Sequence, residues 1–258
     1  MGSPKSEPDR LDRETPHLRK IGRTFAISTY EVTRKQFDAF LQDTINSSFA
    51  SAWEKARQQY SQTPDSPAIA MAWYDAAAYC NWLSKKEGIP EDQWCYEKNS
   101  DGKYAAGMKV KKNYLELTGY RLPSDAEWEY ACRAGATTSR YYGLTESLLP
   151  HYARYTANSE NHSWPVGGLK PNGFGLFDMQ GNAREWCHDP YVAYDVSDPK
   201  QPTPEILYIK PVSDAGIRLL RGGSFNNRPS NVRSAYRLFY RPTYRFTNFG
   251  FRPSRTYP

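Results

Sequence analysis

The sequence predicts an α+β fold with few helices, short strands and much irregular structure. Apolar residues recur at helical spacing only in the first half of the 258-residue chain. From about residue 136 onward, glycine, asparagine, proline and aromatic residues follow one another at short intervals, as in loops and short strands. No internal repeat or low-complexity linker divides the chain, so a single domain is expected over residues 1–258.

The N-terminal elements follow from residue type and capping signals. Residues 1–20 are polar and predict an irregular arm, whereas residues 23–30 alternate apolar and polar side chains as a strand does. Thr33 is a helix N-cap candidate, and residues 34–41 place Phe37, Phe40 and Leu41 on one helix face.

Two further helices and a hairpin are expected before residue 136. Residues 73–86 carry an apolar face at helical spacing and end before Gly88 and Pro90. Residues 95–111 are polar and contain glycine, which is consistent with a hairpin. Ser124 with Glu127 has capping-box spacing, so a helix should begin there and end at Gly135.

Composition excludes a membrane-spanning protein and argues against disorder. No apolar run approaches the roughly 18 residues that a bilayer span requires. The first sixteen residues mix acidic and basic side chains, unlike a signal peptide, so the expected location is cytoplasmic. Aromatic residues make up 15% of the chain and supply large side chains for a core.

The net charge of +6 is concentrated at the C-terminal end. Residues 215–258 contain nine arginines and no lysine, aspartate or glutamate, whereas the remaining chain carries 25 basic and 28 acidic residues. These arginines alternate with tyrosine, phenylalanine and asparagine. We expect most of them to form ion pairs within a loop-rich fold, and the alternative is a recognition surface for an anion or a nucleic acid. Arg233, Arg237, Arg241 and Arg245 are four apart, but Pro242 and nearby glycines argue against a helix.

The cysteines and histidines show no metal-binding spacing. Cys80, Cys95, Cys132 and Cys187 include no CxxC pair, and the four histidines are scattered. With no export signal, free and partly buried thiols are expected.

Eight motifs in order resemble one known family. They are MGSP (1–4), YEVTRKQFDAF (30–40), AAAYCNWL (76–83), RLPSDAEWEYACRAG (121–135), PNGFGLFDMQGNAREWC (171–187), RLLRGGSF (218–225), RSAYR (233–237) and NFGFRP (248–253). Together they resemble the formylglycine-generating enzymes, also called sulfatase-modifying-factor domains, and so imply a variant of the C-type lectin fold. In that family MGSP normally follows a short strand, which leaves open a truncated N-terminal strand. Glu127, Trp128 and Trp186 are expected in or near the core, with Glu185 paired to Arg221 or Arg252.

The sequence departs from the family at the catalytic cysteines. The resemblance implies two copper(I)-binding cysteines five residues apart, but Pro229 and Ser234 stand at those positions. Neither residue replaces a copper thiolate, so no copper is expected and the family's oxidative chemistry does not carry over. Pro253 replaces a third family cysteine. Cys80 and Cys132 match positions that often form disulfides in the family, but their partners are absent. His188 and Asp189 beside Cys187 offer a weaker nucleophilic alternative.

The resemblance also implies structural calcium in residues 177–183. The matching ligands are the carboxylate of Asp178 and backbone oxygens of Met179, Gly181 and Ala183, which suit calcium chemically. A calcium-free turn held by Asp178 hydrogen bonds is the equally weighted alternative. A second family calcium site is not expected at residues 158–164.

Without the cysteines, binding is the function that the sequence favours. The C-terminal segment 218–258 is the candidate surface for a protein or small ligand, and it also resembles the variable region of proteins diversified by retroelements. Candidate ligand-contacting residues are Trp186, Asn226, Asn227, Asn231, Arg237, Phe239, Tyr240, Tyr244, Phe246 and Asn248. A non-catalytic binding module, such as a display or sensor domain, therefore ranks before a divergent oxidoreductase. A nucleic-acid binder ranks third.

Overall fold

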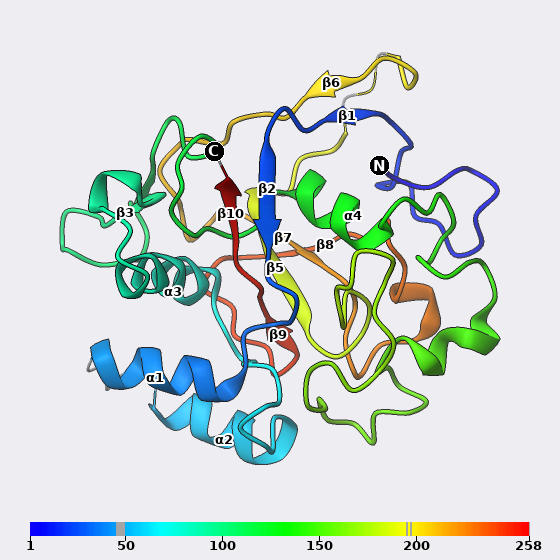
Figure 1. Cartoon of the computed structure of the whole chain (residues 1–258), viewed down its shortest axis with the longest axis horizontal. Helices are drawn as coiled ribbons and strands as arrows, with labels where there is room; N and C mark the ends of the chain where they lie inside the picture. Colours follow the sequence, from blue (N-terminus) through cyan, green and yellow to red (C-terminus); the bar gives the residue numbers. More distant parts are fainter. Residues whose placement is uncertain (45–49, 195, 197, 258) are drawn as a thin grey trace.

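Short strands at the centre of the molecule are flanked by helices and long loops (Figure 1). The computed structural model describes residues 1–44, 50–194, 196 and 198–257. The α-helices of this part of the chain are α1 (Arg34–Thr44), α2 (Ala50–Tyr60), α3 (Trp73–Lys86) and α4 (Asp125–Arg133). Its short 3-10 helices are η2 (Glu91–Gln93), η3 (Glu146–His151) and η4 (Pro229–Asn231). This is the mixed α and β architecture that the sequence predicts.

A four-stranded sheet forms the framework of the second half of the chain. Its order is β8 (Leu238–Tyr240), β7 (Arg218–Arg221), β5 (Arg184–Pro190) and β9 (Phe249–Gly250). Strand β7 is antiparallel to both β8 and β5, whereas β9 runs parallel to β5. Because three of the four strands come from residues 218–250, the arginine-rich segment is part of the sheet itself.

Three two-stranded pairs connect distant parts of the chain. Strand β2 (Thr24–Ile27) pairs with β10 (Ser254–Tyr257) and so joins the N-terminal region to the C-terminal region. Strand β1 (Arg19–Lys20) pairs with β6 (Thr203–Pro204). Strands β3 (Tyr96–Glu97) and β4 (Lys109–Val110) form the hairpin predicted over residues 95–111.

The helix signals of the sequence are confirmed for three of the helices. Helix α4 begins at Ser124, whose hydroxyl accepts a bond from the Glu127 amide in a complete capping box. It ends at Ala134 in the left-handed conformation, one residue before the expected Gly135. Helix α3 has the predicted bounds, and α1 extends to Thr44 instead of residue 41. The sequence analysis did not predict α2, which buries only Trp53 and Ala56 among its described side chains and therefore shows little periodicity.

Aromatic side chains fill the core between α1, α3 and the sheet. Phe37 of α1 contacts Tyr79 of α3 and Phe251, and Trp186 of β5 packs against Phe249. All four cysteines are free and buried, which confirms the expected thiols and places them deeper than predicted. Trp186 has no exposed surface, and its indole N–H donates to the Met71 carbonyl over 2.7 Å. Its place among the ligand-contacting residues is therefore wrong, whereas its predicted core role is confirmed.

The arginine repeat over residues 233–245 forms no helix, as Pro242 predicts. It passes through a turn, strand β8 and a loop before β9. No helix in the described residues has both the length and the apolar character that crossing a bilayer demands.

Candidate ligand-binding surface

Five of the nine arginines of the C-terminal segment pair with carboxylates from elsewhere in the described chain, and four of these five are buried. Arg221 donates from Nε to Asp125 over 2.6 Å and from Nη2 to Glu129 over 3.0 Å. Arg233 binds Glu7 over 2.6 Å and Glu14 over 2.8 Å. These pairs are buried, so they fix the segment on the scaffold.

Further ion pairs neutralise positive charge of the segment. Arg252 binds Glu185, the second of the two partners that the sequence analysis offered, and Arg237 lies 3.2 Å from Asp125. Arg245 forms a bidentate pair with Asp75, the residue whose carboxylate also accepts from the Ala72 amide at the start of α3. The segment is therefore held from several sides, and carboxylates of described residues neutralise five of its nine arginines.

Three aromatic side chains of the segment form one exposed cluster. The Tyr240 ring centroid lies 5.6 Å from Tyr244 and 4.9 Å from Phe246, and Tyr244 and Phe246 are 5.7 Å apart. Tyr244 is 39% exposed and Phe246 is 44% exposed. Phe249 of β9 supports the cluster from the core, with its ring 5.1 Å from Phe246. Large exposed rings held against one another are typical of recognition surfaces.

Three asparagines form a polar group nearby in sequence. Ser224 donates from its hydroxyl to Asn226 and Asn227, each over 2.9 Å. Asn248 in turn donates from Nδ2 to Ser224 and to Asn226, each over 2.9 Å. Asn226 is exposed, whereas Asn227 and Asn248 are half-buried. We call the three asparagines with Tyr240, Tyr244 and Phe246 the C-terminal surface.

Other predicted contact residues lie outside this surface. Arg237 is almost fully buried, with its guanidinium 3.8 Å from the Tyr194 ring centroid, so its predicted ligand contact is corrected to a structural role. Phe239 is half-buried against Tyr191, with Arg13 of the N-terminal arm over its ring. Asn231 is half-buried and is the last residue of η4. Its carbonyl oxygen would lie 2.8 Å from a Cβ atom on Gly223, so only glycine permits this approach, and the φ of Gly223 is 74°.

The positions of the family's copper cysteines contain no metal-binding chemistry. Pro229 begins η4, and Ser234 is fully buried. The Ser234 hydroxyl accepts from Gln180 Nε2 over 3.1 Å and from the Cys132 thiol over 3.7 Å. Burial raises the pKa of Cys132 to about 12, so a neutral thiol lies beside a neutral hydroxyl. A copper(I) site requires soft thiolates, and this pair supplies none.

Cys187 and His188 do not form a nucleophilic pair. Both are buried on β5, where adjacent side chains point to opposite faces of the sheet. Cys187 packs in the cluster around Trp128, whereas the His188 ring stacks 4.2 Å from Tyr114. Burial raises the pKa of Cys187 and lowers that of His188, so each is neutral and unreactive.

The predicted calcium loop encloses a glutamate that the sequence analysis missed. Asp178 has φ of 54° and accepts from the Gly167 amide over 2.7 Å. Glu31 accepts from the Ala183 amide over 2.7 Å and from Asn182 Nδ2 over 2.8 Å. Within the described residues, no group of three acidic, histidine or cysteine side chains is arranged to hold a metal. The Asp178 carboxylate and nearby backbone carbonyls still match calcium in kind, since that ion accepts such a donor set.

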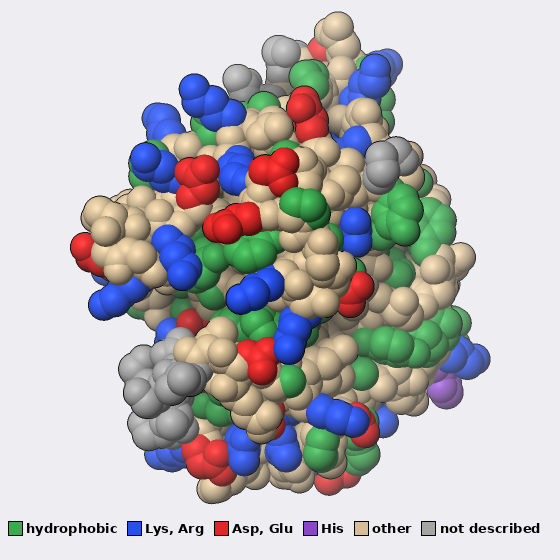
Figure 2. All heavy atoms as spheres, turned by 60° about the vertical axis from the view of Figure 1, so that its left-hand side comes forward, with side chains coloured by type: hydrophobic (Ala, Val, Ile, Leu, Met, Phe, Trp, Pro, Cys, Tyr) green, Lys and Arg blue, Asp and Glu red, His purple; other side chains and the backbone are tan. Residues whose placement is uncertain are grey.

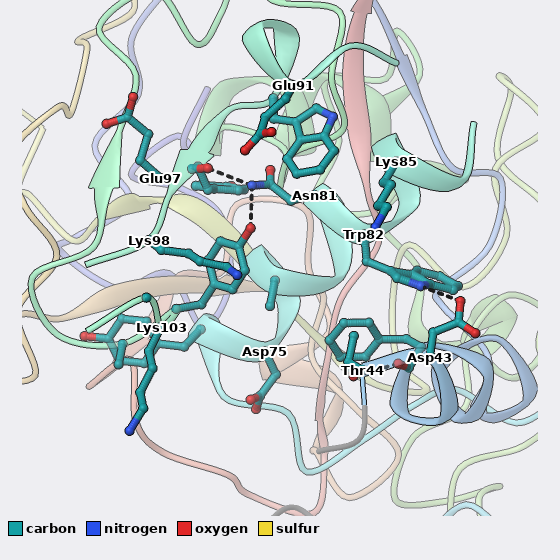
Figure 3. A pocket seen from close by; sticks show the side chains of 18 of the residues that line it. Asp43, Thr44, Asp75, Asn81, Trp82, Lys85, Glu91, Glu97, Lys98 and Lys103 are labelled. Carbon is teal, nitrogen blue, oxygen red and sulfur yellow. Dashed lines mark hydrogen bonds between the residues drawn. The ribbon is translucent and has the colours of Figure 1, made fainter. Parts of the chain in front are cut away.

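A wide groove lies next to the C-terminal surface. It measures about 1300 Å³ and runs between α1, α3 and the segment around β3, with Arg245 at its rim. Figure 2 shows apolar side chains within the hollow and charged side chains of both signs around it. Asn81 lies at its centre and donates to Tyr104 and to the Tyr96 carbonyl, while its Oδ1 has no partner (Figure 3). No sequence signal indicated this groove, because residues far apart in the chain line it.

A smaller cavity of about 330 Å³ brings together Asp125, Asp189, Tyr194 and Arg237. Asp189 accepts from the Asp125 amide over 2.5 Å. Burial, followed by the charge of Asp125, raises the pKa of Asp189 to about 8. Asp125 keeps its charge because Arg221 and Arg237 outweigh its burial and lower its pKa to about 2.

Comparison with known proteins places this geometry in a family. The chain is 30% identical over 188 residues to the chaperone protein LppX of Paenibacillus barcinonensis, covering 63% of this chain and 61% of that one. It is 28% identical to the formylglycine-generating enzyme of Bos taurus, covering 73% of this chain and 44% of that one. The aligned part of the chain thus spans less than two thirds of either relative.

Two solved structures share the fold over nearly the whole chain. PvdO from Pseudomonas aeruginosa has a TM-score of 0.75 at 28% identity, covering 100% of this chain and 90% of that one. Treponema denticola variable protein 1 has a TM-score of 0.75 at 26% identity, covering 99% and 93%. The sequence profile of the sulfatase-modifying factor enzyme 1-like domain matches residues 1–257. The chain therefore belongs to the family of sulfatase-modifying factor enzyme 1-like domains.

Proposed function

We propose that this protein is a non-catalytic binding module whose partner, a protein or a small ligand, contacts the C-terminal surface. The observation that carries the proposal is the exposed ring cluster of Tyr240, Tyr244 and Phe246 beside three asparagines. Buried ion pairs hold the framework around it, so the surface is ordered before a partner arrives. Such preorganisation lowers the entropy cost of binding.

Selection from a peptide-display library tests this proposal and requires no candidate partner. Random peptides are selected on the wild-type protein and then measured against a variant with Tyr244→Ser and Phe246→Ser. We expect the selected peptides to lose at least about tenfold in affinity for this variant, as truncation of central aromatic contacts usually causes.

The matched control uses another exposed aromatic pair. Tyr130 and Phe174 are 54% and 50% exposed, with ring centroids 5.6 Å apart. The Tyr130→Ser, Phe174→Ser variant should bind the selected peptides like the wild type. Equal loss in both variants, or peptides insensitive to Tyr244 and Phe246, would contradict the assignment.

The proposal also requires that oxidative catalysis be absent. Incubation with copper(I), oxygen and a Cys-x-Pro-x-Arg peptide should give no formylglycine and no copper binding, because Ser234 and Pro229 offer no thiolate. Formylglycine formation would establish the alternative, a divergent oxidoreductase.

Display of a variable surface is the second candidate function. It is favoured by the similarity to Treponema denticola variable protein 1 and by the position of Tyr244, Phe246 and the three asparagines in loops beside the sheet. A reverse transcriptase gene with a near-copy of the coding region for residues 224–248 beside this gene would support it. An unrelated gene neighbourhood, with identical sequences at these positions across strains, would oppose it.

Nucleic acid is the least favoured partner, because within the described part of the chain five of the nine C-terminal arginines are paired with carboxylates, four of them in buried pairs. Only weak binding to single-stranded DNA is expected. A steep decrease in affinity with rising salt, equivalent to several phosphate contacts, would indicate a nucleic-acid binder instead.

We also propose that the loop around Asp178 binds structural calcium through the Asp178 carboxylate and the backbone oxygens of Met179, Gly181 and Ala183. Calcium should then raise the melting temperature of the wild type relative to the chelator-treated protein, and Asp178→Asn should remove most of this difference. Identical melting with calcium and with chelator would favour the calcium-free turn.

A further inference from the structure

Arg184, at the start of β5, differs from most other buried arginines that surround the sheet. Arg121, Arg221, Arg233 and Arg252 each form an ion pair with a carboxylate. Arg184 is only 2% exposed and has no such pair among the described residues. Its Nε and Nη1 are buried without a hydrogen-bond partner, and Nη2 donates to the side-chain oxygen of Asn227. Arg218 of β7 also lacks a carboxylate partner in the described chain, but it donates to the His188 carbonyl and lies over the Trp73 ring.

The surroundings of Arg184 are electrostatically positive. Its guanidinium lies 5.4 Å from the Tyr236 ring centroid, and the guanidinium of Arg13 lies 5.6 Å from the same centroid. Arg13 also lacks a carboxylate partner in the described chain, and its Nε is buried without a hydrogen bond. Burial lowers the pKa of Arg184. Tyr236, through its charge and a side-chain hydrogen bond, and Tyr240 oppose the shift, and Arg13 adds to it. None of these described neighbours is acidic.

A buried guanidinium with unused donors is a costly arrangement in a folded protein. Transfer of a charge out of water is unfavourable unless hydrogen bonds and an opposite charge compensate for it. Here the compensation is one amide oxygen and two tyrosines. The position is therefore suited to receive a negatively charged group that the chain does not itself supply.

Asn227 supplies the hydrogen-bond acceptor for Arg184 Nη2. Its backbone carbonyl accepts from the Thr156 amide over 3.0 Å, so the main chain is fixed, whereas the side chain is half-buried below exposed Asn226. The Asn227 side-chain oxygen accepts from Arg184 Nη2 and also from the Ser224 hydroxyl, so its displacement would free this donor of Arg184. The Asn227 oxygen thus occupies a donor site that a stronger acceptor can take.

We propose that Arg184 is the anion-binding anchor of the C-terminal surface and receives a carboxylate or phosphate group of the bound ligand in place of the Asn227 side chain. A planar guanidinium binds either oxyanion through paired hydrogen bonds, which a lysine does not reproduce. This inference rests on the proposed function, because it assigns a chemical class to the ligand of the same surface. It adds that the ligand is acidic.

The test is an NMR titration of the arginine Nε–H signals with sodium phosphate and, separately, sodium acetate at constant ionic strength. The Arg184 signal should shift saturably with at least one of them. Saturation by phosphate alone or acetate alone identifies the oxyanion. Saturation by neither overturns the proposal.

Variants separate the anchor from general positive charge. Arg184→Gln should weaken binding of the saturating anion at least about tenfold, Arg184→Lys should weaken it less, and Asn227→Ala should strengthen it. Arg228→Gln, which removes an exposed arginine of the same loop, serves as the control and should bind like the wild type. Equal binding by wild type and Arg184→Gln overturns the proposal.

The peptide selection distinguishes this inference from the proposed function. If selected peptides bind the C-terminal surface but show no acidic preference and no loss with Arg184→Gln, the module stands and the anion anchor fails. If no peptide depends on Tyr244 and Phe246 while the anion titration still saturates at Arg184, the anchor stands and the proposed function fails.

Discussion

Glu185 and Arg252 form a fully buried bidentate pair that joins β5 to the chain after β9. Arg252 Nε donates to Glu185 Oε2 over 2.8 Å, and Nη2 donates to Oε1 over 2.8 Å. The Trp128 indole N–H also donates to Glu185 over 2.7 Å, so α4 is tied to the same carboxylate. Arg252 further donates to the carbonyls of Ser28 and Thr29. One ion pair thus connects four segments of the chain.

Glu185→Gln should therefore destabilise the protein strongly. It leaves a buried guanidinium without its anion, which typically costs about 3 to 5 kcal/mol. Urea denaturation measures the change in the free energy of unfolding. As a control, Glu54→Gln alters a pair of half-exposed side chains with Arg57 and should change it by less than about 1 kcal/mol. Similar effects from both substitutions would contradict the assigned role.

Arg184→Met should have the opposite effect on stability. It removes a buried charge that lacks a carboxylate, so the free energy of unfolding should rise by about 1 to 3 kcal/mol. Arg252→Met is the matched comparison, since it removes a paired buried arginine and should lower stability. A loss of stability in Arg184→Met as large as that in Arg252→Met would show that Arg184 serves the fold.

Asp189 should make stability fall as the pH rises toward neutrality. Its pKa is about 8 in the folded protein, above its ordinary value near 4, so the folded state binds the extra proton between these values. Because the pKa of Asp189 is higher in the folded than in the unfolded protein, its protonated form stabilises the fold. This stabilisation is complete at a pH below the unfolded pKa and is lost as the pH rises to the folded pKa. One proton gives a slope of at most about 1.4 kcal/mol per pH unit.

Urea denaturation of the wild type and of Asp189→Asn at pH 5, 6 and 7 measures how much Asp189 contributes to the pH dependence of the free energy of unfolding. The difference in stability between the two proteins should change with pH in favour of the variant at higher pH. A difference that stays constant from pH 5 to pH 7 would show that Asp189 is ionised throughout.

The four thiols should be inert in the native state. Burial raises the pKa of Cys95 to about 12, and it also raises the pKa of Cys80 and Cys187. Reaction with Ellman's reagent at pH 8 should be at least about a hundredfold slower than for a free thiol, because the thiolate is the nucleophile. Unfolding in guanidinium chloride should release four reactive thiols per chain. Rapid native labelling, or fewer than four thiols after unfolding, would contradict the structure.

The sequence predicted the fold where local signals and long-range packing agree. Ser124 and Glu127 form the capping box that their spacing implies, and residues 73–86 form the helix that their apolar face implies. The sequence analysis did not predict helix α2, because Trp53 and Ala56 are its only buried residues among the described side chains and give no clear helical periodicity. Of the candidate ligand contacts, Tyr244 and Phe246 between β8 and β9 are exposed and Asn248 is half-buried, whereas Trp186 and Arg237 are buried. Residue type did not distinguish them, because tryptophan and arginine serve both framework and surface.

Arg184 and Glu31 show a second reason why the sequence did not reveal every residue of the site. Arg184 resembles any framework arginine in sequence, and its lack of a carboxylate emerges only when every neighbour is in place. Glu31 lies far from the loop at residues 178–183 in the chain but binds its amides in space. Such relationships depend on long-range contacts, which no local pattern records.

The arginine pairing described above also sets an order on biosynthesis. Glu7 and Glu14 are synthesised more than 200 residues before Arg233, their partner at a sequence separation of 226 and 219 residues. The same holds for the carboxylates that pair with Arg221 and Arg252, which are synthesised before these arginines: Asp125, Glu129 and Glu185. Until the C-terminal arginines have been synthesised, these carboxylates lack the partners that pair with them in the folded protein. The native ion pairs can therefore form only after the C-terminal arginines have been synthesised.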